Sequence, residues 1–412
     1  MTHRIALALV AMVVAAAGCG HDATPQEVPI VNESATESTW LAGAAETVIT
    51  QIKDRPEVYM DLHARALVLG TGEQRVAIVA MDLGTVNYAL SGEIISAIHA
   101  ATAIPQENIL ICPSQTHNAP GVDDRPMARE NQLWLAGTLA ELVKAAAGNA
   151  EPATLRVGRA PVQIGYNRRL MVDGQIVMEP NPDGAVIPWV DTLAAYDTDG
   201  ELISVLFSHA AHPVIVHWSS DAIGPDYPGY AVNHLHNLLG DRGVFMFAQG
   251  SCGNINGYPL RGGFAACDAA GLALAVAVTE ALKDDQPVAA GALRSADRTV
   301  SLPRPATGQG DLPFPMRAIT LGDELCILTL TGEMFAEYQL WAEDVSPFAH
   351  TFVFNHTNGL SGYIATRADY ELGDAGGYEC QANLDPSVEQ IVRDGMLDVL
   401  NELKTPATDP TE

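Results

Sequence analysis

Short apolar runs rich in β-branched residues recur along the chain, and turn residues bound most of them. Such runs are typical of buried strands, and they lie at residues 64–70, 76–81, 109–112, 203–208, 244–248, 325–330 and 351–354. Apolar residues with a helical period lie between or after these runs, around residues 91–101, 132–147, 269–282 and 388–403. Strands that alternate with helices predict an α/β fold, here with a mixed, largely parallel central sheet flanked by helices on both faces.

The stretch from residue 155 to residue 190 departs from this pattern, because its apolar residues alternate in short pieces. Turn sequences such as Val172-Asp173-Gly174 and Asn181-Pro182-Asp183-Gly184 separate the pieces. We therefore expect β-hairpins inserted beside the main sheet. A chain of 412 residues with 48% hydrophobic content can bury a large core, and no break in composition decides between one large domain and two.

The chain carries 50 acidic and 22 basic residues, which gives a formal net charge of -28. A surface of this sign repels the phosphates of nucleic acids, so that no nucleic-acid partner is expected. The surplus carboxylates indicate a solubilising acidic surface, and no Asp-x-Asp-x-Asp-Gly calcium loop occurs in the sequence.

The N-terminus has the features of an export signal. Arg4 precedes an apolar run from Ile5 to Ala17, which is too short to span a bilayer and is typical of a signal peptide, here residues 1–18. Cys19 follows small residues as in a bacterial lipobox, so that we expect a lipid on Cys19 and a tether over residues 19–39. The protein would then be an exported, membrane-anchored lipoprotein that faces the periplasm or the cell surface. Ordinary secretion with cleavage nearby is the alternative.

Five cysteines remain beyond Cys19, which allows at most two internal disulfides. Cys252 and Cys267 are the closest pair in the sequence. They could form a disulfide in an oxidising compartment, although spacing alone does not establish the bond.

Four polar residues follow apolar strands, where ligands of α/β proteins commonly bind; they are His117, His212, Glu333 and Tyr363. A histidine at a strand end is equally often a hydrogen-bonded structural residue, and a single glutamate can be a charge at a helix N-terminus. Our interpretation is that the four segments converge on one metal-centred hydrolytic site.

Imidazole, carboxylate and phenolate groups are all accepted zinc ligands, and an open position lowers the pKa of zinc-bound water to roughly 7. The resulting hydroxide attacks amides and esters at neutral pH. No HExxH motif is present, which excludes the common zinc-protease helix. Gln249 takes the place of the first glycine of a G-x-S-x-G nucleophile elbow, so that Ser251 does not fit that motif.

Taken in order, the motifs of this chain resemble those of the neutral/alkaline (non-lysosomal) ceramidase family, in its N-terminal catalytic domain. The matching segments are residues 64–69, 116–121 (THNAPG), 166–169 (YNRR), 212–213 (HP), 226–230 (DYPGY), 249–256, 332–333 (GE), 362–366 (GYIAT) and 377–379 (GYE). The resemblance implies one ceramidase-like catalytic domain over residues 40–405, without the C-terminal β-sandwich of the longer family members. We expect residues 406–412 to be a disordered tail.

The resemblance further implies a zinc-dependent amidase that cleaves N-acyl sphingosine, a lipid amide of sphingolipid metabolism. One zinc ion would be bound by His212, Glu333 and Tyr363. The family's remaining zinc histidine stands two residues before the equivalent of His117, and here that position is Gln115. A neutral amide is a much poorer zinc ligand than imidazole, so that Gln115 binds weakly, His117 replaces it, or the metal is lost.

The residues that would contact the substrate also follow from the resemblance. His117, Arg168 and Tyr378 would line the substrate carbonyl and stabilise the tetrahedral oxyanion, a task that usually dominates acyl-transfer catalysis. Asn256 takes the place of the family's essential serine. This replacement disfavours ceramide itself as the substrate even if hydrolysis is retained.

Three hypotheses follow. The first is a zinc-dependent hydrolase of an N-acyl amide or a related ester. The second, motivated by Gln115 and Asn256, is a non-catalytic cell-surface binding protein on a degenerate ceramidase-like scaffold. The third and weakest is a serine or cysteine hydrolase that uses Ser251 or Cys252.

Overall fold

The computed structural model describes residues 39–50, 57–121, 127–304, 310–380 and 384–404, which belong to one compact unit that spans Ser38–Glu412. The predicted signal peptide at 1–18, the lipid site at Cys19, nearly all of the tether and the tail at 406–412 lie outside the described residues. The first strand begins at Trp40, where the folded domain was expected to start.

The main sheet has nine strands. Their order is β11 (Val244–Gln249), β10 (Leu202–His209), β9 (Trp189–Asp197), β5 (Glu151–Pro161), β1 (Trp40–Val48), β2 (His63–Thr71), β3 (Gln74–Met81) and β4 (Ile109–Pro113), and β13 (Gln286–Val288) pairs with β5. The pairs β10–β11 and β3–β4 are parallel, and the other pairs are antiparallel. The mixed sheet is therefore confirmed, but antiparallel pairs outnumber the parallel pairs that we expected to dominate.

The lengths of the connections explain this correction. Parallel neighbours need a crossover, and helix α1 (Tyr88–Thr102) joins β3 to β4 while α3 (Asp226–Leu239) joins β10 to β11. Strands β2 and β3 are joined by a two-residue turn, which permits antiparallel pairing only. Gly72 has a φ of 52° in that turn, a conformation that glycine adopts without strain.

A second sheet contains four strands in the order β14 (Leu293–Leu302), β15 (Leu312–Leu321), β16 (Leu325–Leu330) and β18 (His350–Phe354). From their apolar pattern we expected residues 325–330 and 351–354 to complete the main sheet. They instead pair with each other, and β16 pairs with β15, which forms a hairpin with β14. A strand's apolar pattern does not encode which sheet it joins, because both sheets offer a buried face.

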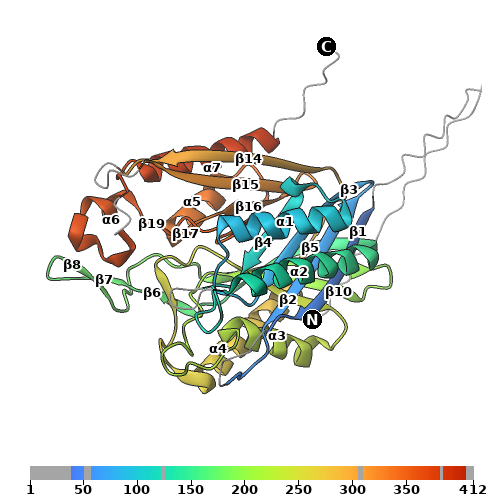
Figure 1. Cartoon of the computed structure of the whole chain (residues 1–412), viewed down its shortest axis with the longest axis horizontal. Helices are drawn as coiled ribbons and strands as arrows, with labels where there is room; N and C mark the ends of the chain where they lie inside the picture. Colours follow the sequence, from blue (N-terminus) through green and yellow to red (C-terminus); the bar gives the residue numbers. More distant parts are fainter. Residues whose placement is uncertain (1–38, 51–56, 122–126, 305–309, 381–383, 405–412) are drawn as a thin grey trace, which may run out of the picture. The chain divides into compact units, whose positions relative to one another are not determined.

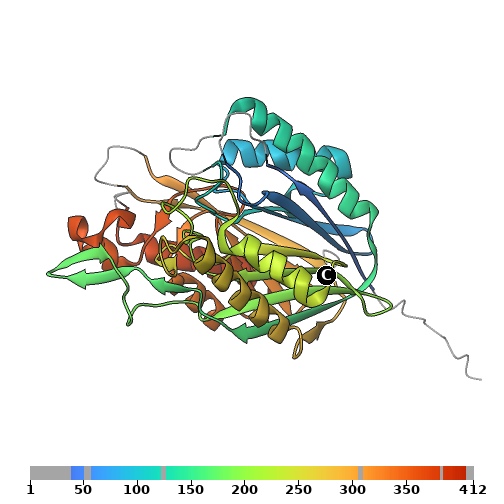
Figure 2. The same ribbon diagram turned by 90° about the horizontal axis from the view of Figure 1, so that it is seen from below.

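The two sheets pack face to face, and helices cover the outer faces. Side chains of β2 alternate accordingly: Leu67 and Leu69 belong to the core between the sheets, whereas Ala66 and Val68 belong to the core under α1 and α2 (Arg129–Gly148). Helices α3 and α4 (Gly263–Ala281) pack against each other beside these, and α7 (Val388–Lys404) packs on β14 and β15 (Figures 1 and 2). Helices therefore cover one face of each sheet, where we expected them on both faces of one sheet.

Helix α4 is long and apolar enough to cross a membrane by composition alone. Its side chains Cys267, Leu274, Ala275 and Val278 are buried in the core beside β5 and β9, as in a core helix of a globular protein.

Short elements at one end of the sheets build the site. Strand β6 (Gly165–Asn167) pairs with β12 (Ile255–Gly257), and β17 (Glu333–Met334) pairs with β19 (Tyr363–Ile364). The expected inserted hairpin is β7 (Arg169–Val172) with β8 (Gln175–Met178). Residues 155–161 and 189–190, at the two ends of the stretch that was expected to be inserted, instead lie in strands β5 and β9 of the main sheet. Helix α5 (Ala336–Val345), helix α6 (Arg367–Glu371) and three 3-10 turns (Gln106–Asn108, Gly373–Gly376 and Tyr378–Cys380) complete the described elements.

The cysteines of the described residues are all buried and free. The Cys252–Cys267 disulfide that we considered is therefore not formed. The Cys252 thiol donates to Gln115 Oε1 at 3.0 Å, whereas Cys267 lies beside Asp226.

Candidate active site

Strand pairing places four of the predicted site residues. Glu333 and Tyr363 are direct partners in the parallel pair β17–β19, so that both side chains leave the same face. His212 forms an isolated bridge with Asn256 of β12. Segments that are far apart in the sequence thus meet at one end of the two sheets.

The side chains of Gln115, His212, Glu333 and Tyr363 meet at a common centre. His212 Nε2 lies 3.1 Å from Gln115 Nε2, 3.3 Å from Glu333 Oε2 and 3.4 Å from the Tyr363 hydroxyl. The structure therefore brings together the four residues that the sequence analysis named as metal ligands. Their role as ligands stays a prediction.

His212 is held in one tautomer. Its Nδ1 lies 2.8 Å from the carbonyl oxygen of Cys252 and 3.0 Å from that of Ile255. Both partners are acceptors, so that Nδ1 carries the proton and the Nε2 lone pair points into the centre. Burial, and then the positive charge of Arg168, lower the pKa of His212. A neutral imidazole anchored through Nδ1 in this way is the usual arrangement of a metal-binding histidine.

Glu333 is an ionised carboxylate. Burial raises its pKa, but the neighbouring His212 and His356 lower it more, and the balance is a pKa well below the usual value. Gln115 Nε2 also donates to Glu333 Oε2 at 2.8 Å. Burial, and then the charge of Glu333, raise the pKa of the Tyr363 phenol well above its ordinary value, so that this hydroxyl is protonated at neutral pH.

Gln115 decides how well these residues fit a metal ion. Its amide NH2 group donates to both His212 and Glu333, in the place where a cation would contact them. It is 2% exposed and has a φ of 67°. No cluster of three or more His, Cys, Asp or Glu side chains with metal-site spacing occurs within the described ranges. His212, Glu333 and Tyr363 fit a divalent cation chemically, and Gln115 fits one only if its carbonyl oxygen turns inward.

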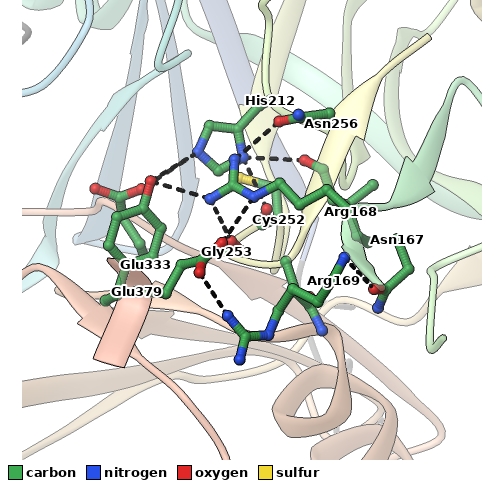
Figure 3. Close-up of polar contacts among 12 residues, drawn as sticks. Asn167, Arg168, Arg169, His212, Cys252, Gly253, Asn256, Glu333 and Glu379 are labelled. Atoms are coloured by element: carbon green, nitrogen blue, oxygen red, sulfur yellow. Dashed lines mark hydrogen bonds and ion pairs between the residues drawn. The ribbon is translucent and has the colours of Figure 1, made fainter. Parts of the chain in front are cut away.

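Arg168 is locked beside this centre (Figure 3). Its Nε donates to Glu379 Oε1 at 3.1 Å and its Nη1 to Asn256 Oδ1 at 2.8 Å. Its Nη2 donates to the Gly253 carbonyl at 2.8 Å and to the Tyr363 hydroxyl at 3.2 Å. A Cβ on Gly253 would lie 2.5 Å from the carbonyl oxygen of Glu333, so that only glycine allows this close approach.

Glu379 bridges two buried guanidinium groups. Its Oε2 accepts from Arg169 Nη1 at 2.5 Å while its Oε1 accepts from Arg168. Arg169 also donates to Asp369 at 2.8 Å, and this ties the hairpin β7–β8 to α6. In the sequence, Glu379 stands out only as part of the motif at residues 377–379, and its position beside Arg168 could not be predicted from the sequence.

The other predicted residues lie around the centre. The His117 ring is 5.8 Å from that of His212 and 5.1 Å from that of His217. Burial is the largest cause that lowers the pKa of His117 well below its usual value. The Tyr378 ring meets the Tyr363 ring at 5.5 Å and is 38% exposed, so that it lies at the rim. The Asn256 amide nitrogen is buried without an acceptor among the described residues.

His356 is a site residue that the sequence analysis missed. It is fully buried, neither ring nitrogen has a hydrogen-bond partner within the described part of the chain, and its Nε2 lies 3.9 Å from Glu333 Oε2. The signal was available, because the apolar strand at 351–354 runs out at His356 as other strands do at His117 and His212.

Ser251 and Cys252 do not fit the nucleophile role of the third hypothesis. Both are fully buried. The Ser251 hydroxyl accepts from Asn355 Nδ2 at 2.7 Å, and burial raises the pKa of the Cys252 thiol well above its ordinary value, which disfavours the reactive thiolate.

Comparison with solved structures identifies the fold. The chain is similar to the neutral ceramidase from Pseudomonas aeruginosa, with a TM-score of 0.75 and 18% identity over 90% of this chain and 76% of that chain. A ceramidase complexed with C2 is also similar, with a TM-score of 0.74 and 17% identity over 90% of this chain and 77% of that chain. No protein-family model matches the sequence, and no curated protein matches it. At this low identity the likeness establishes the fold, which confirms the ceramidase-like architecture that the motifs predicted.

Proposed function

We propose that this chain, which has the fold of neutral ceramidases, is a hydrolase of an N-acyl amide of the ceramide type or of a related ester. The observation that carries the proposal is the meeting of His212, Glu333 and Tyr363 around the His212 Nε2 lone pair. A buried cation, Arg168, lies beside them. A neutral imidazole, an ionised carboxylate and a fixed guanidinium around one centre are the groups that hydrolysis of an acyl bond needs.

The proposal includes one zinc ion, bound by His212 Nε2, Glu333 and Tyr363, with the carbonyl oxygen of Gln115 as a weak fourth ligand. Bound there, zinc would polarise an acyl carbonyl and lower the pKa of a water molecule to roughly 7. Gln115 would have to turn its amide, and Tyr363 would have to lose its proton, so that metal binding should release a proton and depend on pH.

The residues of the chain would have distinct tasks in the reaction. Arg168 is held by four acceptor groups and cannot turn away, so that its charge would steady a developing oxyanion without reorganisation. Tyr378 at the rim and the neutral His117 would contact the substrate carbonyl. The Asn256 amide nitrogen is buried without an acceptor in the part of the chain that the structure describes, and it would donate to the substrate in place of the family's serine hydroxyl.

A second candidate is a cell-surface protein that binds lipid amides without cleaving them. The Gln115 amide favours it, because its two N–H groups satisfy His212 and Glu333 without any cation. On this proposal the protein still binds lipid amides but no longer hydrolyses them.

One experiment separates the two candidates. The purified protein is assayed for metal content by mass spectrometry and for hydrolysis of N-acyl sphingosine and a matched ester, with and without a chelator. If the protein is a hydrolase, the wild type turns over the substrate and His212→Ala does not. A chelator should stop turnover by the wild type, and added zinc should restore it. Saturable binding of the lipid without turnover, and without stoichiometric metal, would establish the second candidate and reject the first.

We also propose that the protein is exported and anchored by a lipid on Cys19, as its first 19 residues suggest. Cells that express the full chain should incorporate labelled fatty acid into the protein, and Cys19→Ala should abolish the label and release the protein from membranes. Label that persists in Cys19→Ala would contradict lipidation at this residue.

A further inference from the structure

A second cavity, of about 400 Å³, shares no lining residue with the candidate active site. Its walls come from β5 and β9 of the main sheet, from the segment around β13, and from the end of α5 and β18 of the second sheet. A volume of this size suits a small organic molecule.

The charges around this cavity are unbalanced. Asp191, Asp284 and Glu343 line it, whereas its basic lining residues are Arg159 and His350, and burial lowers the pKa of His350. Arg159 Nε donates to Asp191 Oδ1 at 2.6 Å, and its Nη2 donates to Glu343 Oε2 at 2.8 Å. A single cation therefore serves two carboxylates, and a third carboxylate lies at the same cavity.

Asp191 is the deepest of these carboxylates, with 4% exposure. Burial raises the pKa of Asp191 to about 7, and the neighbouring Arg159 only partly opposes this. The Arg159 guanidinium is fixed over the Trp189 ring, 4.4 Å from its centroid. The one guanidinium is thus divided between Asp191 and Glu343, and a second positive charge in the cavity would stabilise the ionised Asp191 carboxylate.

We propose that this cavity binds a small organic ammonium ion, whose charged end pairs with Asp191 and Glu343 and whose apolar part lies against Phe348 and Phe352. The two phenylalanines line the same cavity as the carboxylates, so that its lining contains both charged and apolar side chains. The proposal does not rest on the hydrolytic activity, because none of these residues contacts the candidate active site centre.

Three probes of matched shape test the proposal by calorimetry with the full chain at about pH 8, where the Asp191 carboxylate is ionised. Phenethylamine carries an ammonium group, 2-phenylethanol is neutral, and phenylacetate is an anion. We expect phenethylamine to bind one site per chain, and the other two probes to bind at least about 10-fold more weakly, or about 1.4 kcal/mol.

Variants locate the binding. Asp191→Asn should weaken the binding of phenethylamine at least about 10-fold. Asp199→Asn removes the same charge from an exposed turn and should bind phenethylamine as tightly as the wild type does. Ala349→Trp fills the cavity mouth while it keeps every charge, so that it tests the site even if Asp191→Asn folds poorly.

Three results would each overturn the proposal. They are equal affinity for the ammonium and neutral probes, wild-type affinity in both Asp191→Asn and Ala349→Trp, and absence of phenethylamine binding at about 10 mM.

Discussion

Glu333 and Asp191 are both buried carboxylates, with 8% and 4% exposure, yet their surroundings shift their pKa values in opposite directions. Glu333 receives a hydrogen bond from Gln115 and lies beside two histidines, and its pKa is well below the usual value. Asp191 shares Arg159 with Glu343, and burial raises its pKa to about 7. Burial alone therefore does not set the pKa of these groups; the side chains that surround each one decide the direction of the shift.

The two regions are connected through α5. Gln339 Nε2 donates to Glu343 Oε1 at 2.9 Å, and Gln339 Oε1 accepts from the Ser251 amide at 2.9 Å. The next residue, Cys252, offers its carbonyl to His212. The cavity that we propose to bind ammonium ions thus lies a few hydrogen bonds from the imidazole of the active site.

The largest change in stability is expected at Glu379, the carboxylate beside the active site that pairs with two buried arginines. Glu379→Ala should destabilise the fold by about 3–5 kcal/mol, because it leaves Arg168 and Arg169 without their shared partner. Urea unfolding measures the change. The exposed Glu371→Ala on α6 is the matched control and should stay within about 0.5 kcal/mol. A loss below about 1 kcal/mol for Glu379→Ala would show that the two guanidinium groups do not depend on it.

The next largest effect is on catalysis, where we compare loss of the Glu333 carboxylate with loss of the Asp191 carboxylate. Glu333→Gln keeps the shape of the side chain and removes its charge, and it should lower kcat/KM for the proposed amide substrate at least about 100-fold, or about 2.7 kcal/mol. Asp191→Asn removes a charge of similar burial and should leave kcat/KM within about 2-fold. Equal losses in the two variants would mean that the reaction needs a stable fold but no charge at Glu333.

The sequence predicted the elements better than their pairing. The strand-like runs and amphipathic stretches correspond to observed strands and helices, because burial of one face imposes a regular spacing of apolar residues along the sequence. Whether β16 and β18 join the main sheet was not predictable, because both sheets bury apolar strands equally well. Antiparallel pairing followed from the two-residue β2–β3 turn, which the sequence showed but which we weighed less than the strand–helix alternation.

The candidate site was predicted in part. His212, Glu333 and Tyr363 could be named because each follows a strand and because the family motifs contain them. The opposing role of the Gln115 amide could not be predicted, since its direction depends on contacts with His212 and Glu333 across the fold. Asp191 gave no signal at all, because a charged residue within a strand pattern usually faces solvent, and its partner Arg159 lies 32 positions away.

The opposite pKa shifts also predict opposite responses to pH. Asp191 has a folded pKa of about 7, above its value of 3.8 in the unfolded chain, so that its contribution to stability is present at low pH and is lost as pH rises through 7. Between about pH 5.5 and 7.5 the wild type should lose about 2 kcal/mol that Asp191→Asn does not lose. Urea unfolding of both proteins across this range measures the difference. Parallel stability curves would contradict the raised pKa of Asp191.

The smallest effect is expected at the rim of the active site, where partial exposure weakens every interaction. Burial raises the pKa of Tyr378 to about 12, so that its hydroxyl is protonated and can donate to a substrate carbonyl. Tyr378→Phe keeps the ring contact with Tyr363 and should lower kcat about 10-fold, or about 1.4 kcal/mol, with the free energy of unfolding unchanged within about 0.5 kcal/mol. Tyr258→Phe, at 60% exposure, is the control and should change neither quantity. A fall in stability with an unchanged kcat would assign Tyr378 to packing, and stabilisation of the oxyanion would then be left to Arg168 and His117.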